Sequence, residues 1–253
     1  MTTLNYDRLA TELVAQAEGF AALVAGADHR AAVPTCPEWT LGDLVFHLGS
    51  AYHRAFTLVT SRERIALPFE EIPVDAPSPP EGDWVREGAA KLASALIEAG
   101  PDTVLTSWLF DLPARFWLRR LTCDTVVHRA DAAFTVGKPY EVAADLAAEV
   151  VSEGLDLLLA NMAAERSPAK EALKGTGQTL HFHATDEGLG EWLIQRTPEG
   201  INWSHGHAKG DVAVRATAAD LMLGLTGRIP IDDRFAVFGD ASLLTHWLEH
   251  TKF

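Results

Sequence analysis

Asp124 and His128 stand four residues apart in the segment RFWLRRLTCDTVVHRADAAF, residues 115–134. On an α-helix this spacing places both side chains on one face. A carboxylate and an imidazole arranged in this way can bind one divalent cation, as the paired histidines do on the helix of zinc proteases. Two ligands do not hold a catalytic metal, so a third must come from another segment.

His47 is the candidate third ligand, because it lies within the largely apolar run LVFHLGSAY. A histidine on a second helix, facing Asp124 and His128 inside a bundle, gives three protein ligands and leaves a fourth position open. From spacing alone a plainer interpretation stays open, in which Asp124 and His128 form a surface pair and His47 is a hydrogen-bonded core histidine. Asp131 is either a surface charge or the acceptor for a ligand imidazole.

The elements that must position these residues are amphipathic helices. Apolar residues recur at intervals of three or four, which predicts helices over 6–24, 41–60, 84–99, 112–134 and 141–164. Thr40 and Asp43 have the spacing of a capping box and predict the start of the second helix after a turn at Pro34 and Pro37. The proline-rich segment 66–83 is expected to be a long loop.

Beyond Pro168 the hydrophobic period changes from helical spacing to alternation, as in LHFHA at 180–184. Short antiparallel strands are predicted near 180–184, 192–194 and 212–214, with helices at 217–225 and 240–249. The polar segment 165–178 has the composition of a linker. The prediction is therefore an α+β chain, with a helical bundle over 1–166 and a small α+β domain over 167–253.

Other histidines are not expected to bind metal. His181 and His183 alternate with apolar residues, which predicts that both lie on the wetter face of a strand. The segment SHGH at 204–207 is interpreted as a strand end or turn. No glycine-rich, phosphate-binding loop is found.

Composition limits the partners of the 253-residue chain. It has 35 acidic and 21 basic side chains, a formal net charge of −14, which disfavours binding to nucleic acid or to a membrane surface. Apolar runs are shorter than the roughly 20 residues of a membrane span, and the first residues lack the pattern of a signal peptide. Cys36 and Cys123 are expected to be free thiols, and the protein is expected to be cytoplasmic.

Two segments carry a family resemblance: VPTCPEWTLGDLVFHLG at 33–49, and the pattern R-x-x-x-D-x-x-x-H-R-x-D at 120–131. Together they resemble the mycothiol-dependent maleylpyruvate isomerase family of actinobacteria. The resemblance extends more loosely to 212–228. It implies a DinB-like metal-binding four-helix bundle, with up to five helices, followed by a sterol-carrier-like α+β domain. It also implies that His47, Asp124 and His128 bind a divalent ion, with zinc as the expected metal.

One ligand departs from the family pattern, which usually has Glu where this chain has Asp124. The aspartate side chain is one methylene shorter, so its carboxylate must be met by a shifted metal or a bridging water. Aspartate remains a hard oxygen ligand suited to zinc distances.

The resemblance implies an isomerase or S-transferase that activates mycothiol, or another low-molecular-weight thiol, for attack on a small electrophile. Residues that bind the thiol are not identified. Arg120 and Arg228 are the candidate catalytic cations for an anionic substrate, whereas Arg54 and Arg215 are expected to form structural ion pairs. The alternative is a non-catalytic ligand-binding or regulatory protein with a structural metal. The sequence leaves the oligomeric state, monomer or dimer, open.

Overall fold

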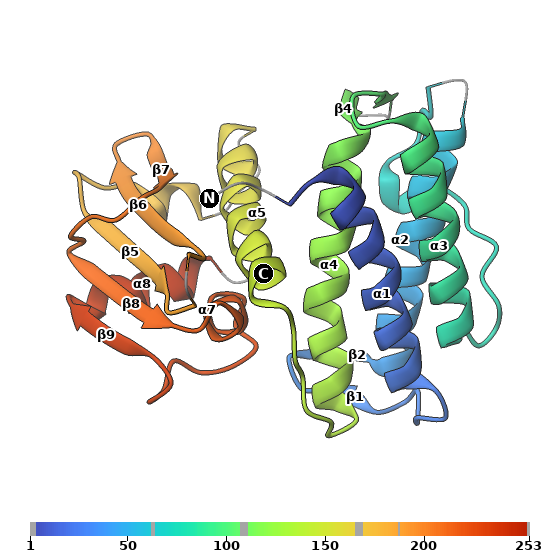
Figure 1. Ribbon diagram of the computed structural model, residues 1–253, viewed down its shortest axis with the longest axis horizontal. Coiled ribbons are helices and arrows are strands. Elements are labelled where there is room, and N and C mark those ends of the chain that lie inside the picture. The colour runs from blue at the N-terminus through green and yellow to red at the C-terminus, as the bar shows by residue number, and fades with distance from the viewer. Residues whose placement is uncertain (1–3, 62–63, 107–110, 165–168, 187, 252–253) are drawn as a thin grey trace. The chain divides into compact units, whose positions relative to one another are not determined.

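The structure is a computed structural model that describes residues 4–61, 64–106, 111–164, 169–186 and 188–251 (Figure 1). Its contacts divide the chain into two compact units, Leu4–Tyr140 and Glu141–Phe253, here called the N-terminal and C-terminal units. The expected boundary at 166 and 167 lies outside the described residues, and the change of packing partners occurs earlier, between Tyr140 and Glu141. Each unit is described by itself.

In the described residues the N-terminal unit is a bundle of four α-helices (Figure 1). Helices α1 and α2 each pack against both α3 and α4. The predicted helices are confirmed, with small differences at their starts, since α3 begins two residues earlier than expected and Pro113 precedes α4 as its N-cap. The four helices are α1 (Tyr6–Val24), α2 (Leu41–Thr60), α3 (Gly82–Ala99) and α4 (Ala114–Thr135).

A complete capping box fixes the start of α2, as the sequence predicts. The Asp43 amide donates to Thr40 Oγ1 at 3.2 Å, and the Thr40 amide donates to Asp43 Oδ2 at 2.8 Å. The inward face of α2 then buries Leu44, Leu48 and Tyr52 completely. The cap fixes the residue at which α2 begins, and the buried apolar face fixes how the helix is rotated about its axis. Together they determine the direction of the His47 side chain.

Short elements that the sequence did not predict connect the helices. Strands β1 (Ala32–Val33) and β2 (Cys36–Thr40) pair antiparallel around the proline-containing turn before α2. Strands β3 (Val104–Thr106) and β4 (Asp111–Pro113) form a second antiparallel pair before α4. One 3₁₀ turn, Phe69–Glu71, lies in the proline-rich loop. Such short strands carry too little alternation to be recognised in the sequence.

Helices α2 and α3 approach closely at Gly49, and this contact gives a stability prediction. A Cβ added at Gly49 would lie 2.1 Å from a ring carbon of Trp84. We expect Gly49→Ala to lower the free energy of unfolding by about 1–3 kcal/mol through overpacking, despite the better helix propensity of alanine. Urea denaturation measures the change. In a Trp84→Leu background the same substitution should cost clearly less, and an equal cost in both backgrounds would contradict this explanation.

The C-terminal unit contains a five-stranded sheet in the order β7-β6-β5-β8-β9, together with helices (Figure 1). Its strands are β5 (Thr179–Ala184), β6 (Glu191–Thr197), β7 (Gly200–His205), β8 (Val212–Ala216) and β9 (Ala236–Gly239). Its helices are α5 (Ala144–Ala163), α6 (Lys170–Leu173), α7 (Ala218–Leu225) and α8 (Ala241–His250). The α+β class is therefore confirmed.

Two features of this unit differ from the sequence expectation. Strand β8 pairs with β5 in parallel, with Phe182 opposite Val214, whereas all strands were predicted to be antiparallel. Helix α5, assigned by sequence to the bundle, packs on α7 and contacts β7. A buried hydrogen bond of 2.9 Å from Trp192 Nε1 to Ser152 Oγ joins β6 to α5. Hydrophobic period identifies a strand or a helix but does not specify its partner or direction.

Candidate metal centre

The three predicted ligands converge inside the N-terminal unit. His47 comes from α2, while Asp124 and His128 lie one turn apart on α4. His47 Nε2 is 3.2 Å from Asp124 Oδ2, and His128 Nε2 is 3.8 Å from Asp124 Oδ1. One ligand atom from each residue can be chosen so that all three lie within 4.8 Å of one another.

These separations fit a tetrahedral divalent ion. Two donors about 2.1 Å from such an ion are about 3.4 Å apart. The observed 3.2 and 3.8 Å lie on either side of this value, and each involves a different oxygen of Asp124. Two imidazole nitrogens and a carboxylate form a donor set that suits zinc and related metals. Asp124 therefore reaches the cluster in spite of its shorter side chain.

Asp131 orients one of the ligands. The side chain is fully buried, and its Oδ2 is 2.7 Å from His128 Nδ1. Thr35 Oγ1 donates to the other carboxylate oxygen at 2.5 Å. When the proton of the His128 ring is on Nδ1 and is donated to Asp131, the lone pair of Nε2 is directed toward His47 and Asp124. Histidines that bind metals commonly have such a hydrogen bond on their other nitrogen. Of the two predicted roles for Asp131, the buried acceptor matches the structure and the surface charge does not.

Arg120 holds the carboxylate of Asp124. Arg120 Nη2 donates to Asp124 Oδ1 at 2.5 Å from one helical turn away. Burial raises the pKa of Asp124, but the charges of Arg120 and His128 and the hydrogen bond from His47 lower it more, so this pKa lies well below its usual range. Asp124 is therefore ionised and available as a ligand at neutral pH.

Trp39 of β2 covers one side of the centre. Its ring centroid is 5.0 Å from that of His47 and 5.9 Å from that of His128. The His47 side chain is 37% exposed, against 17% for Asp124 and 11% for His128. Trp39 thus shields one side of the centre, and the side next to His47 is accessible to solvent. The position of Trp39 beside the centre could not be foreseen, because the short strand pair that brings it there was not predicted.

A buried hydrogen bond joins α2 to α4 next to the centre. Tyr52 Oη and Thr125 Oγ1 are 2.6 Å apart, and both side chains are completely buried. Burial raises the pKa of Tyr52 above its usual range, so this phenol stays neutral. Arg54 was expected to form an ion pair, and in the structure its Nε donates to the backbone carbonyl of Ile72 at 3.1 Å.

The remaining sequence candidates lie outside this cluster. Arg228 follows α7 in the C-terminal unit, where its Nη1 donates to the Thr226 carbonyl at 2.7 Å. Neither Cys36 nor Cys123 is in a disulfide bond. Across the part of the chain that the structure describes, no helix is both long and apolar enough to cross a membrane.

Comparison with known families covers most of the chain. Residues 10–133 match the family model described as the mycothiol maleylpyruvate isomerase N-terminal domain, and residues 145–246 match the model of the corresponding C-terminal domain. The chain belongs to the mycothiol-dependent maleylpyruvate isomerase family. The resemblance inferred from the sequence is confirmed.

Solved structures agree with the fold of this family member. A crystal structure of mycothiol-dependent maleylpyruvate isomerase aligns with 94% of this chain and 95% of its own, at 16% identity and a TM-score of 0.54. A histidine-to-alanine mutant of that isomerase aligns over the same shares at a TM-score of 0.53. An uncharacterized protein of Mycobacterium tuberculosis, matched in strains H37Rv and CDC 1551, is 26% identical over 137 residues, which are 52% of this chain and 69% of the relative.

Proposed function

We propose that this chain is a divalent-metal-dependent enzyme that uses a low-molecular-weight thiol to transform a small electrophile. The observation that carries the proposal is the convergence of His47, Asp124 and His128 at one partly open position. Three protein ligands with an accessible fourth position are typical of catalytic rather than structural zinc sites. Family membership supports mycothiol as the thiol and maleylpyruvate as the first substrate to test.

A bound zinc-like ion would lower the pKa of a thiol at the open position, so that the thiolate is available at neutral pH. The chain's own residues prepare this position. Asp131 holds the His128 ring in one orientation, and Arg120 keeps Asp124 ionised and fixed. Trp39 excludes water from one side of the two imidazoles.

Isomerisation needs no net change in the thiol. The thiolate adds to the activated carbon–carbon double bond, the resulting single bond rotates, and elimination restores the double bond and releases the thiolate. In an S-transferase the new carbon–sulfur bond would remain. Both reactions require the same nucleophile, and the family relationship favours isomerisation.

Two arginines are proposed to supply positive charge for an anionic substrate. Arg120 contacts Asp124, so we propose that it positions this ligand and adds positive charge beside the centre. Arg228 is proposed as a second cation for substrate, on the family resemblance alone. Alanine variants separate these roles, since loss of Arg120 should weaken metal binding and loss of Arg228 should raise KM without changing metal content.

The activity itself is tested with the zinc-loaded protein, maleylpyruvate and a panel of thiols that includes mycothiol. We expect isomerisation that requires both the metal and a thiol, and His47→Ala should lower kcat/KM by at least about 100-fold, because one of three ligands is lost. His29→Ala, a histidine outside the cluster, is the matched control. Metal binding without turnover by any thiol would support the non-catalytic alternative instead.

A further inference from the structure

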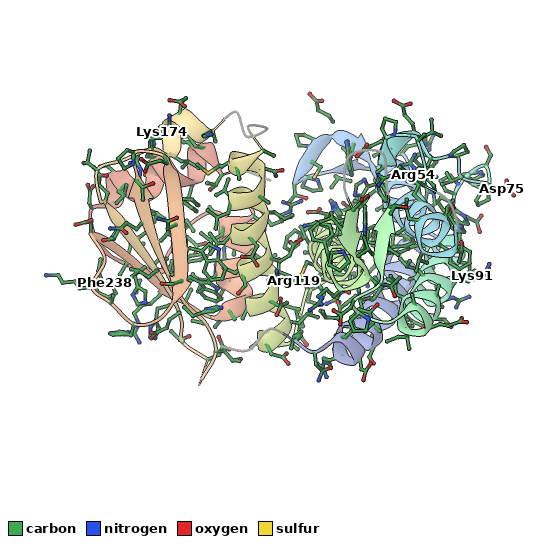
Figure 2. The ribbon with its side chains drawn as sticks, turned by 90° about the horizontal axis from the view of Figure 1, so that it is seen from above. Arg54, Asp75, Lys91, Arg119, Lys174 and Phe238 are labelled. Atoms are coloured by element: carbon green, nitrogen blue, oxygen red, sulfur yellow. The ribbon has the colours of Figure 1, made fainter. Side chains whose placement is uncertain are left out.

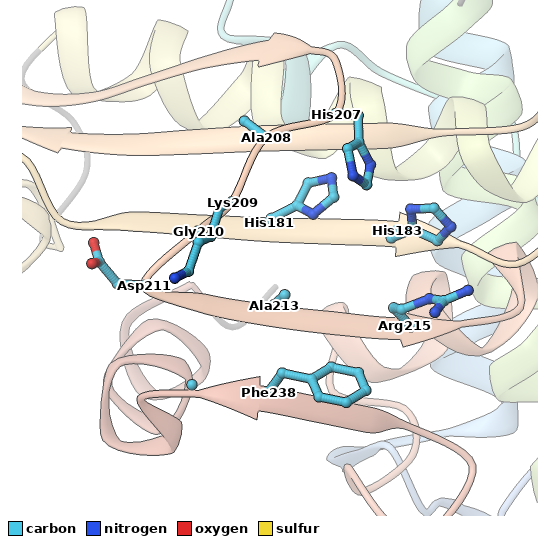
Figure 3. Close-up of a pocket in the computed structure, with 11 residues that line it drawn as sticks. His181, His183, His207, Ala208, Lys209, Gly210, Asp211, Ala213, Arg215 and Phe238 are labelled. Carbon is cyan, nitrogen blue, oxygen red and sulfur yellow. The ribbon is translucent and has the colours of Figure 1, made fainter.

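A second group of metal-ligand side chains lies on the sheet of the C-terminal unit. It consists of His181, His183, Glu191 and His207, here called the sheet cluster. His181 and His183 are two residues apart on β5 and project from the same face, and Glu191 of β6 lies directly opposite His183. His207 follows β7 after Gly206, whose φ of 149° favours glycine. Figure 3 shows the three imidazoles gathered over this face.

The donor atoms of the sheet cluster are close together. His183 Nδ1 is 2.6 Å and His207 Nδ1 is 3.0 Å from Glu191 Oε1, and His181 Nε2 is 4.0 Å from Glu191 Oε2. One ligand atom from each of the four residues lies within 4.8 Å of the others. Tetrahedral zinc ligands are about 3.4 Å apart, and the observed separations of 2.6–4.0 Å span this value.

Two of these nitrogens are buried without hydrogen bonds. Among the described residues, neither His181 Nε2 nor His183 Nδ1 has a hydrogen-bond partner. His181 is only 4% exposed, so its ring is largely shielded from water. His183 Nδ1 approaches Glu191 outside hydrogen-bond geometry. A buried polar nitrogen without a partner is costly, and a metal ion would satisfy both atoms.

An ordinary ion pair explains only part of this arrangement. His207 is within hydrogen-bond distance of Glu191, and their pairing alone would account for these two residues. It leaves His181 Nε2 buried with no hydrogen-bond partner among the described residues. A shared cation accounts for all four side chains together, and imidazole with carboxylate is a donor set that zinc and similar metals prefer.

We propose that the sheet cluster binds a divalent transition metal of the zinc class through His181, His183, Glu191 and His207. Four protein ligands complete a tetrahedral shell, which is typical of structural sites. The ion would fasten the segment between β7 and β8, which carries His207, to strands β5 and β6. The proposed site shares no residue with the site formed by His47, Asp124 and His128, here called the bundle centre. It does not depend on the proposed thiol chemistry.

The site is accessible to metal from solvent. A depression of about 650 Å³ on this face is lined by three of the ligands together with Lys209, Arg215 and Phe238, among others. The His207 side chain is 75% exposed, and Phe238, labelled in Figure 2, is 55% exposed. An exposed fourth ligand beside three more buried ones gives the ion an entry path.

The test counts zinc in the untagged 253-residue chain after metal removal and zinc reconstitution. Wild type should hold two ions, one at each cluster, and His207→Ala should hold one. Zinc titration of His207→Ala should show at least about 10-fold weaker binding at the sheet cluster, and zinc should raise its melting temperature less than that of wild type. Because His207 is exposed, its replacement leaves the core intact.

His205→Ala is the matched control, since this neighbouring histidine is outside the cluster and should leave two ions bound. A His128→Ala background removes the bundle centre, so any remaining ion belongs to the sheet cluster. In that background, adding His207→Ala should lower the count from one to none. The proposal is overturned if His128→Ala alone already binds no zinc, or if His207→Ala lowers zinc content or affinity no more than His205→Ala.

Discussion

Replacing His128 with alanine is expected to remove metal from the bundle centre and to reduce thiol-dependent isomerisation to background. His128 supplies one of three donors, and its side chain is only 11% exposed, so water cannot easily replace it in the same geometry. Even loss of an outer hydrogen-bond partner costs about 10–100-fold in metal affinity or activity, so loss of the ligand itself should cost at least about 100-fold. Zinc counting and steady-state kinetics on the same preparations measure both effects.

The substitution must be separated from simple unfolding. Circular dichroism and urea denaturation establish that the variant is folded, and His128→Gln offers a second variant that nearly preserves side-chain volume. Both variants should bind one ion fewer than wild type. Unchanged zinc content together with unchanged kcat/KM would refute the assignment of His128 as a ligand.

Local signals in the sequence predicted the bundle well. The capping box of Thr40 and Asp43 and the apolar periodicity of residues 6–24 and 41–60 depend only on near neighbours, and both helices have the predicted bounds. The pairing of Asp124 with His128 also follows from helical geometry. Adding His47 required only that two helices of one bundle face each other, and in the structure His47 lies beside Asp124 and His128.

Long-range arrangement was harder to predict. Nothing local indicates that β8 pairs with β5 in parallel or that α5 packs with the sheet. The same limit explains the sheet cluster. His181 and His183 were assigned to a wetter strand face, but His181 is buried, because His207 and Glu191 come from different segments and gather over it. The alternating H-x-H followed by Glu191 in the next strand was the available signal.

Replacing Asp131 tests whether a residue that only contacts a ligand of the bundle centre affects metal affinity. Asp131→Asn keeps the shape of the side chain but removes its charge and leaves one carbonyl oxygen for two donors, Thr35 Oγ1 and His128 Nδ1. Because the side chain at position 131 is fully buried, the donor that loses its acceptor cannot bond to water instead. This loss should lower the free energy of unfolding by about 1–3 kcal/mol. Zinc affinity at the bundle should fall by about 10–100-fold, because the His128 ring is no longer held.

The comparison variant is Thr35→Val, which removes the hydroxyl donor and leaves the contact between His128 and Asp131 in place. It should lower stability but change zinc affinity much less than Asp131→Asn does. This difference separates orientation of the ligand from general loosening of the core, since both variants disturb the same buried carboxylate. Equal losses of zinc affinity in the two variants would mean that Asp131 supports the fold and does not specifically orient His128.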